Sequence, residues 1–318
     1  MAVILDVLVQ ALQMALVLAL APLLTGLVRK TKSRLLRRQG PPLLQPYRDL
    51  LRLSRKEVVL ADNASWLFRV APYLIFAATW VAATLVPTFA TGLMFNWAAD
   101  LIAIIALLGS ARFFLALSGM DIGTSFGGIG SSREVMIASL AEPAMLLIVF
   151  TVALIAGSTQ LSTVSVFLAS ADVGMRISLA LALVALIMVA LAENARIPVD
   201  NPTSHLELTM VHEAMVLEYS GRHLAMIEFG GSLKLLLYVS LIASVFVPWG
   251  IAPQGGTPVE YGFGILSYLL KLTLFGILLA LFETVIAKMR VFRVSQFLGA
   301  ALMLGLLGTL LLFVSRGL

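Results

Sequence analysis

Eight long apolar runs, divided by short charged or turn-rich breaks, limit the fold of this 318-residue chain more than any other feature. Each crossing of a lipid bilayer takes about 20 predominantly apolar residues, and the runs are of that order. Only 12% of the residues are charged, about half the share usual in a soluble domain, which excludes a soluble enzyme. The sequence therefore predicts an all-α, polytopic membrane protein that forms a single integral membrane domain over residues 1–318. Its transmembrane helices, about eight, are expected near residues 3–28, 66–88, 97–119, 135–157, 174–195, 224–250, 262–287 and 296–315.

Lys and Arg residues are divided unevenly between the breaks. If the N-terminus lies outside, sixteen of them fall in cytoplasmic loops, and the opposite loops contain none. The positive-inside rule then predicts that both termini face away from the cytoplasm. We expect the first run to be retained rather than cleaved, because Asp6 stands where a signal peptide carries basic residues. The predicted cytoplasmic loops are about 29–65, 120–134, 196–223 and 288–295.

The first cytoplasmic loop predicts a helix of its own. After the helix-stopping pair Pro41-Pro42, apolar side chains fall on one helical face and basic side chains largely on the other. This pattern is typical of an amphipathic helix in the headgroup plane, over anionic lipid or a docked partner. The alternative is a solvated basic loop that only sets orientation. The two faces are Leu43, Tyr47, Leu50 and Leu51 against Arg48, Arg52, Arg55 and Lys56.

Ionisable residues inside the predicted spans point to function, because each costs at least about 3 kcal/mol to insert at the centre of a bilayer. Glu142 is the sharpest case, since Pro143 follows it and removes one backbone hydrogen bond, so that water can enter. We expect a buried carboxyl there that can pass protons. The alternative is a Glu that pairs with Arg112 or a Lys only to hold two helices together. The full set is Arg112, Glu142, Glu193, Glu228, Lys234, Lys271 and Glu283.

The third cytoplasmic loop is the most polar stretch and contains all three His residues. A helix from about Thr203 to Tyr219 is predicted, with Glu207 and Glu218 on one face. These two carboxylates suit either a proton route or simple salt bridges. His205 and His212 share a roughly opposite face, which is typical of a solvated or partner-contacting helix, and two His residues are a weak signal for a metal.

Missing residues exclude several chemistries. The chain has no Cys, so it contains no disulfide, no thiolate zinc site and no Cys-ligated iron–sulfur cluster. Electron chemistry must therefore take place on partners. Sequence motifs for nucleotide binding, zinc proteolysis and serine hydrolysis are also missing. The glycine-rich stretch 123–130 predicts a flexible loop that acts as a hinge or a docking surface.

Five short motifs, in order along residues 30 to 225, resemble one family closely. This family is the membrane subunit shared by respiratory complex I (its subunit 1, or H chain) and the membrane-bound nickel–iron hydrogenases, including formate hydrogenlyase and hydrogenase-4. The second and third motifs look like the formate hydrogenlyase branch. Thr203 and His205 stand where the complex I branch has glutamates, which argues against a complex-I-like quinone headgroup site. The motifs are Arg37-Arg38-Gln39-Gly40-Pro41 with Gln45-Pro46-Tyr47-Arg48-Asp49; Ala111-Arg112-Phe113-Phe114 with Ser118-Gly119-Met120-Asp121; Ser132-Arg133-Glu134 with Glu142; Glu193-Asn194-Ala195-Arg196-Ile197-Pro198-Val199-Asp200; and Leu217-Glu218-Tyr219-Ser220-Gly221.

The resemblance implies a non-catalytic subunit at the joint between two arms of a redox complex in the plasma (inner) membrane. Such a subunit docks peripheral hydrogenase-like large and small subunits and an iron–sulfur protein, abuts antiporter-like membrane subunits, and links redox chemistry to ion movement. Nickel–iron and iron–sulfur centres are expected on the partners and none on this chain, with no metal site and no nucleic acid. By this resemblance the ion path would contain Glu142, Glu193, Asp200, Glu207 and Glu218, with Arg112 and Arg196 as countercharges. Docking residues would be Arg37, Arg38, Arg48, Arg52 and Arg133, and Tyr47, Leu50 and Leu51 would frame a lipid or quinone opening.

Three alternatives differ from this reading. A subunit of the same family could also bind quinone. A secondary transporter would place charges and Pro or Gly breaks at the same depth, but it usually shows an internal duplication, and the first and third loops have no counterparts. A lipid-modifying enzyme would need a cluster of metal-binding carboxylates that the sequence lacks.

Overall fold

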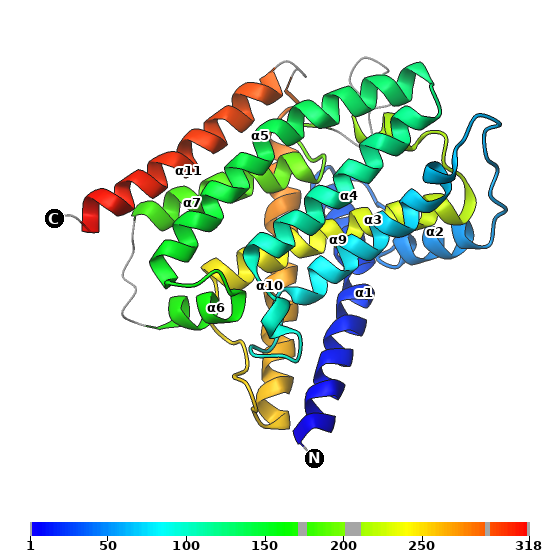
Figure 1. Cartoon of the computed structure of the whole chain (residues 1–318). Coiled ribbons are helices and arrows are strands. Elements are labelled where there is room, and N and C mark those ends of the chain that lie inside the picture. The colour runs from blue at the N-terminus through cyan, green and yellow to red at the C-terminus, as the bar shows by residue number, and fades with distance from the viewer. Residues whose placement is uncertain (1, 171–176, 201–210, 290–292, 317–318) are drawn as a thin grey trace.

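The computed structural model describes residues 2–170, 177–200, 211–289 and 293–316, and it is a bundle of helices (Figure 1). Seven of the described helices are long and apolar enough to cross a membrane, and an eighth apolar helix is shorter. All eight fall on the predicted runs, which confirms the all-α, polytopic fold. The seven are α1 (Ala2–Leu35), α3 (Trp66–Leu85), α4 (Leu101–Asp121), α5 (Ser125–Ala156), α9 (Gly221–Phe246), α10 (Pro258–Val285) and α11 (Val294–Arg316); the shorter one is α7 (Ile177–Glu193).

Polar side chains at the helix starts explain where several spans begin. Ser65 accepts a hydrogen bond from the backbone of Leu67 before α3, and Asp100 accepts one from Ile102 before α4. Before α10, Thr257 and Glu260 form a complete capping box. Each cap satisfies amide groups that the first helical turn leaves without a partner.

Short helices fill the connections. The predicted amphipathic helix of the first loop forms as α2 (Gln45–Ser54), which packs against α1 and α9. Two others are α6 (Leu161–Ala169) and α8 (His212–Val216), and η1 (Asn96–Ala98) is a single 3-10 turn. The helix predicted from Thr203 to Tyr219 is described only from residue 211, and there it is helical over α8 alone; its first part lies outside the described residues.

Two helices, α1 and α5, are longer than the apolar runs predicted. The first helix does not stop at residue 28 but continues to Leu35. The predicted flexible loop 123–130 is wrong, because Thr124 caps α5 and residues 125–130 form its first turns. Since polar and glycine residues break the hydropathy signal without breaking the helix, both helices extend beyond their apolar runs.

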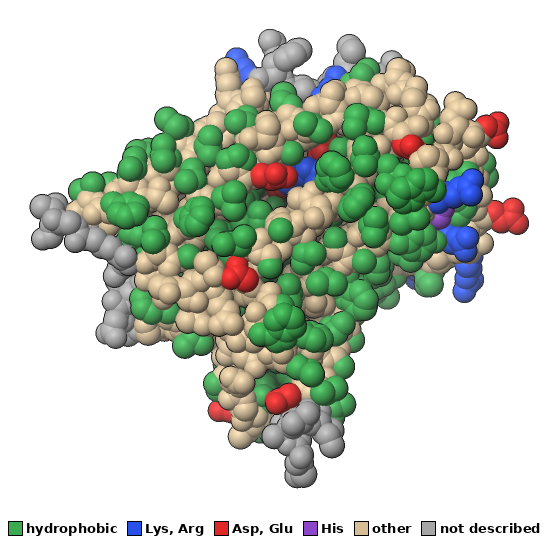
Figure 2. Space-filling model, viewed as in Figure 1, with side chains coloured by type: hydrophobic (Ala, Val, Ile, Leu, Met, Phe, Trp, Pro, Cys, Tyr) green, Lys and Arg blue, Asp and Glu red, His purple; other side chains and the backbone are tan. Residues whose placement is uncertain are grey.

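The long helices form a layered arrangement in which α3, α4 and α5 follow one another and α11 packs on α5 and α7. The α1 and α10 helices lie side by side and run steeply across the others (Figure 1). Hydrophobic side chains are spread over the whole face seen in Figure 2, and Lys and Arg side chains gather at its right edge, where α2 lies in Figure 1, with others along the top. An apolar belt with basic groups at one edge is what a membrane-embedded chain requires.

Candidate functional site

Arg112 is the centre of a group of ion pairs inside the bundle. It lies near the middle of α4, and only 5% of its side chain is exposed. Its Nη2 contacts Glu193 at the end of α7, while Oε1 of Glu142 lies 3.5 Å from Nη1 and Oε1 of Glu134 lies 3.7 Å from Nε. Lys234 of α9 places its Nζ 2.8 Å from Oε2 of Glu193. We call these five residues the Arg112 cluster.

The Arg112 cluster holds three carboxylates against two cations. The side chain of Glu193 is 1% exposed and faces both cations, whereas the side chain of Glu142 is 45% exposed. An uncompensated charge in a buried site costs several kcal/mol even after relaxation. One more positive charge, such as a proton, would balance the cluster, so the arrangement suits uptake and release of a proton.

Glycines bring the cluster's two main helices into contact. A Cβ on Gly127 of α5 would lie 2.1 Å from the carbonyl oxygen of Gly119 in α4, so the two backbones touch at this point. Farther along the same pair of helices, a Cβ on Gly109 would lie 3.4 Å from Oε1 of Glu142. The small residues of α4 therefore leave the space in which the α5 carboxylates approach Arg112.

A cavity of about 80 Å³ adjoins the Arg112 cluster. Arg112, Glu134, Glu193 and Lys234 line it, and His212 of α8 reaches its wall. A cavity of this size with several polar groups can hold a few water molecules, each of which takes about 30 Å³ in the liquid. It therefore gives the carboxylates a place where water can carry protons.

A second group of charges lies at the C-terminal end of α10. Glu283 is 3% exposed and binds two cations, with Lys32 Nζ at 2.9 Å and Arg196 Nη1 at 3.2 Å. Burial lowers the pKa of Arg196, and the charge of Glu283 opposes that shift. Next to it, Lys288 Nζ lies 2.8 Å from Oδ1 of Asp200. We call Glu283, Lys32 and Arg196 the Glu283 cluster.

The structure brings together only part of the predicted ion path. Glu142 and Glu193 meet at the predicted countercharge Arg112, so Glu142 pairs as the structural alternative expected. Asp200 pairs with Lys288 instead, and Glu218 is exposed on the turn after α8.

The surroundings of Glu142 and Arg196 differ from those expected. The expectation that Glu142 is buried is wrong for this chain, because its side chain lies half-exposed at the edge of the α4–α5 pair. Arg196 serves as the countercharge of Glu283 rather than of a predicted path residue. Glu207 lies outside the described residues.

Most of the predicted docking residues lie on the surface in or just before α2. Four of them are exposed and the fifth, Arg133, is half-buried in α5. At the predicted opening, the hydroxyl of Tyr47 donates to the backbone carbonyl of Ala19, which ties α2 to α1, and Leu51 is 58% exposed. The exposed four are Arg37, Arg38, Arg48 and Arg52.

Four members of the two clusters are not among the ion-path or countercharge residues predicted from the sequence. Lys234 and Glu283 were identified only as membrane-embedded charges, and Lys32 was counted as part of the basic loop. Glu134 entered only as a letter of the third motif. Its spacing of eight residues from Glu142, about two helical turns, could have placed both carboxylates on one face of α5.

The remaining embedded charges lie apart from both clusters. Glu228 is exposed on α9, and Lys271 donates to the carbonyl oxygen of Val247 at 2.6 Å. Among the described residues, no three His, Asp or Glu side chains are grouped as a metal site would need. His205 lies outside these residues.

Comparisons with known proteins agree with this architecture. Residues 8–314 match the NADH dehydrogenase family. The chain is 35% identical to "Formate hydrogenlyase subunit 4" of Escherichia coli (strain K12), over 90% of this chain and 92% of that protein. It is 34% identical to "Hydrogenase-4 component C" of the same strain, over 87% of both chains.

More distant relatives extend the similarity to complex I and to a solved structure. "NADH-ubiquinone oxidoreductase chain 1" of Triticum aestivum is 28% identical over 71% of this chain and 72% of its own length. A chain in the structure of the membrane-bound sulfane sulfur reductase, an archaeal respiratory membrane complex, superposes with a TM-score of 0.79 at 19% identity. The superposition covers 96% of this chain and 99% of that one, which shows a shared fold.

Proposed function

This chain belongs to the NADH dehydrogenase family and is a membrane subunit of a hydrogenase-like or complex I-like redox complex, and from this premise we propose that it couples electron transfer in a peripheral arm to proton movement in the membrane. The observation that carries the proposal is the Arg112 cluster. Three carboxylates and two cations meet there beside a small polar cavity in the middle of the bundle. Ionisable groups at such depth are costly, and they occur mainly where ions or protons pass.

The charge balance of the cluster gives the proposed mechanism. Glu193 shares its two oxygens between Arg112 and Lys234, which holds it as the fixed anion. Glu134 and Glu142 contact Arg112 only at 3.7 and 3.5 Å, so a proton can move to either of them at smaller cost in ion pairing. A shift of Arg112 toward one of these carboxylates then favours protonation of the other.

The exposure of Glu142 supports a partner inside the membrane. Its side chain is 45% exposed in the part of α5 that follows Glu134, where the other residues carry no charge. A carboxylate facing lipid at this depth is unfavourable, so another protein surface is expected to cover it. An antiporter-like membrane subunit is the proposed neighbour, and Glu142 is the proposed point at which the proton path leaves this chain.

The proposed complex has its redox centres elsewhere. The chain has no Cys to hold an iron–sulfur cluster, so we place nickel–iron and iron–sulfur centres on peripheral subunits docked near α2 and the start of α5. We place the complex in the bacterial inner membrane, with both termini of this chain away from the cytoplasm. The complex I relatives support quinone binding near Tyr47, Leu50 and Leu51 as a second candidate, since α2 packs there against α1 and α9.

We expect Glu142→Gln to leave the complex assembled and electron transfer active, but to lower coupled proton movement at least about tenfold, because a positioned proton-transfer group is lost. The measurement is pH change inside proteoliposomes that contain the purified complex, normalised to electron-transfer rate. Glu228→Gln is the matched control, because Glu228 is a second exposed acid on a spanning helix outside the Arg112 cluster. Normal coupling in Glu142→Gln would remove this residue from the path.

We expect Arg48→Glu to release the peripheral arm, because it reverses a charge on the exposed face of α2. Arg133→Glu is expected to do the same at the start of α5. Subunit stoichiometry after purification through a tag on this chain measures both effects. Arg48→Lys keeps the charge and should keep the arm. Full stoichiometry in the two Glu variants would show that docking takes place elsewhere.

A further inference from the structure

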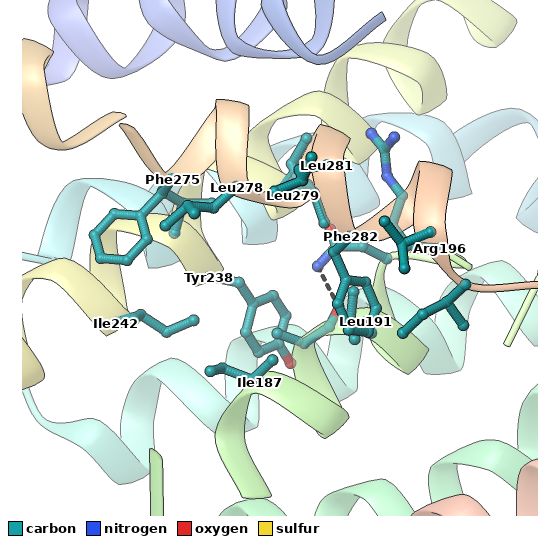
Figure 3. Close-up of a pocket in the computed structure, with 16 residues that line it drawn as sticks. Ile187, Leu191, Arg196, Tyr238, Ile242, Phe275, Leu278, Leu279, Leu281 and Phe282 are labelled. Atoms are coloured by element: carbon teal, nitrogen blue, oxygen red, sulfur yellow. Dashed lines mark hydrogen bonds between the residues drawn. The ribbon is translucent and has the colours of Figure 1, made fainter. Parts of the chain in front are cut away.

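A large apolar cavity between α7, α9 and α10 takes no part in the proposed proton path. Its volume is about 490 Å³, and its walls are almost entirely hydrocarbon. The cavity exists because α10 packs chiefly on α1 and leaves a gap on the side facing α7 and α9. Figure 3 shows the side chains that surround it, including Ile187, Leu191, Tyr238, Ile242, Phe275 and Leu279.

The cavity opens to the surface of the chain along α10. Three of its lining residues are strongly exposed: Leu278 at 48%, Leu281 at 47% and Val285 at 77%. In a membrane this surface faces acyl chains or another subunit. The cavity is therefore a side pocket reached from the bilayer and not a sealed void.

The volume of the cavity fits one small apolar occupant. About 490 Å³ lies within the range of pockets that hold one small apolar molecule or chain. The space therefore suits a thin hydrocarbon chain.

Charge at one end of the cavity selects the kind of lipid. Arg196 lies at this end, and its guanidinium points away from the apolar centre (Figure 3). Arg196 and Lys32 share the single carboxylate of Glu283, and Arg29 is close enough to act electrostatically on Arg196. Three cations against one carboxylate leave an excess of positive charge, which favours an anionic headgroup.

We propose that this cavity holds one acyl chain of an anionic phospholipid, with the phosphate of its headgroup beside Arg196 and Arg29. The apolar walls would contact the acyl chain, and the excess positive charge would attract the phosphate. The segments at this end are fixed to one another, because the amide of Met289 donates to the carbonyl oxygen of Pro198 at 2.8 Å and Lys288 binds Asp200. The site is thus built into the chain.

The position of Asn194 gives the lipid a structural consequence. Asn194 lines both this cavity and the small cavity beside Arg112, and its Nδ2 donates to the carbonyl oxygen of Ala190 at 2.8 Å. Asn194 therefore forms part of the wall between the proposed lipid chain and the cavity beside Arg112. A hydrocarbon chain in the larger cavity would keep water out on that side.

Photo-crosslinking in the intact complex tests the site. The photoreactive amino acid p-benzoylphenylalanine replaces Leu278, which lines the cavity. The matched control carries it at Leu274, one helical turn away. Leu274 is 53% exposed and is not part of the lining. The complex is stripped of loosely held lipid in detergent, incubated with phosphatidylglycerol or phosphatidylcholine, illuminated and digested. We expect several-fold more lipid adduct at position 278 than at 274, and several-fold more with phosphatidylglycerol than with phosphatidylcholine.

A variant of the headgroup end completes the test. In the Leu278-replaced complex, Arg196→Gln should remove the preference for phosphatidylglycerol, while Arg196→Lys should keep it. Equal adducts at positions 278 and 274, equal capture of the two lipids, or an adduct with a quinone or another polypeptide would each overturn the proposal. None of these readouts uses proton movement, so they are independent of the proposed coupling function.

Discussion

Arg112→Leu is expected to remove most of the folded chain from the membrane. Leucine is similar in bulk to the aliphatic part of arginine, but it leaves Glu134, Glu142 and Glu193 with Lys234 as their only cation in the cluster. Removal of one partner from a buried ion pair costs about 3–5 kcal/mol. That loss is a large part of the roughly 5–15 kcal/mol by which a folded protein is stable. The amount of monodisperse chain after detergent extraction measures the effect.

Two further variants show whether charge is the cause. The double variant Arg112→Leu/Glu193→Gln removes the nearest carboxylate as well, and it should recover a substantial part of the lost protein. Arg112→Lys keeps a cation at this position and should be milder than Arg112→Leu. If Arg112→Leu accumulates at the normal level, the ion pairs of the Arg112 cluster do not stabilise the bundle.

The second large effect is expected at the contact between α4 and α5. Gly127→Ala would place a methyl group 2.1 Å from the carbonyl oxygen of Gly119, and a backbone atom cannot turn aside as a side chain can. Overpacking of this kind costs about 1–3 kcal/mol and sometimes more. We therefore expect a lower melting temperature of the complex and weaker proton coupling, because the same contact sets the position of Arg112 against α5.

Gly128→Ala is the matched control for this prediction. Gly128 lies in the same helical turn, but a Cβ there meets nothing within 4 Å. Alanine is preferred over glycine in a helix by up to about 1 kcal/mol, so this variant should be as stable as the wild type or more stable. Equal melting temperatures for the two variants would mean that residues 125–130 do not pack as a helix against α4.

Hydropathy was sufficient to predict the spans but not their true ends. Among the described residues, the apolar runs placed the seven helices that are long enough to cross a membrane and the shorter α7, because insertion into lipid depends on the same transfer energies that hydropathy measures. The runs could not show that α1 continues through Lys32 to Leu35 or that α5 begins at Ser125. Those turns are polar, and a helix outside the hydrocarbon region needs only its own hydrogen bonds and a cap.

The sequence predicted which charged residues of the candidate site lie in the membrane helices, but not which of them contact one another. Arg112 and Glu193 could be identified as embedded charges from the sequence alone, but their contact depends on how α4 and α7 are rotated toward each other. The pairing of Glu283 with Lys32 joins residues 251 positions apart, and it forms only because α1 lies against α10. The apolar periodicity of one helix shows neither which helix it packs against nor how it is rotated toward that helix.

The length of α5 has a mechanical consequence. Its 32 residues span about 48 Å, against about 30 Å for the hydrocarbon core of a bilayer. Arg133, where a peripheral subunit is proposed to dock, lies in the third turn of this helix, and Glu142 lies near its middle. A twist of α5 applied through a docked subunit would alter the spacing between its two acids, Glu134 and Glu142, and Arg112 of α4, although this chain has no Cys to hold an iron–sulfur cluster.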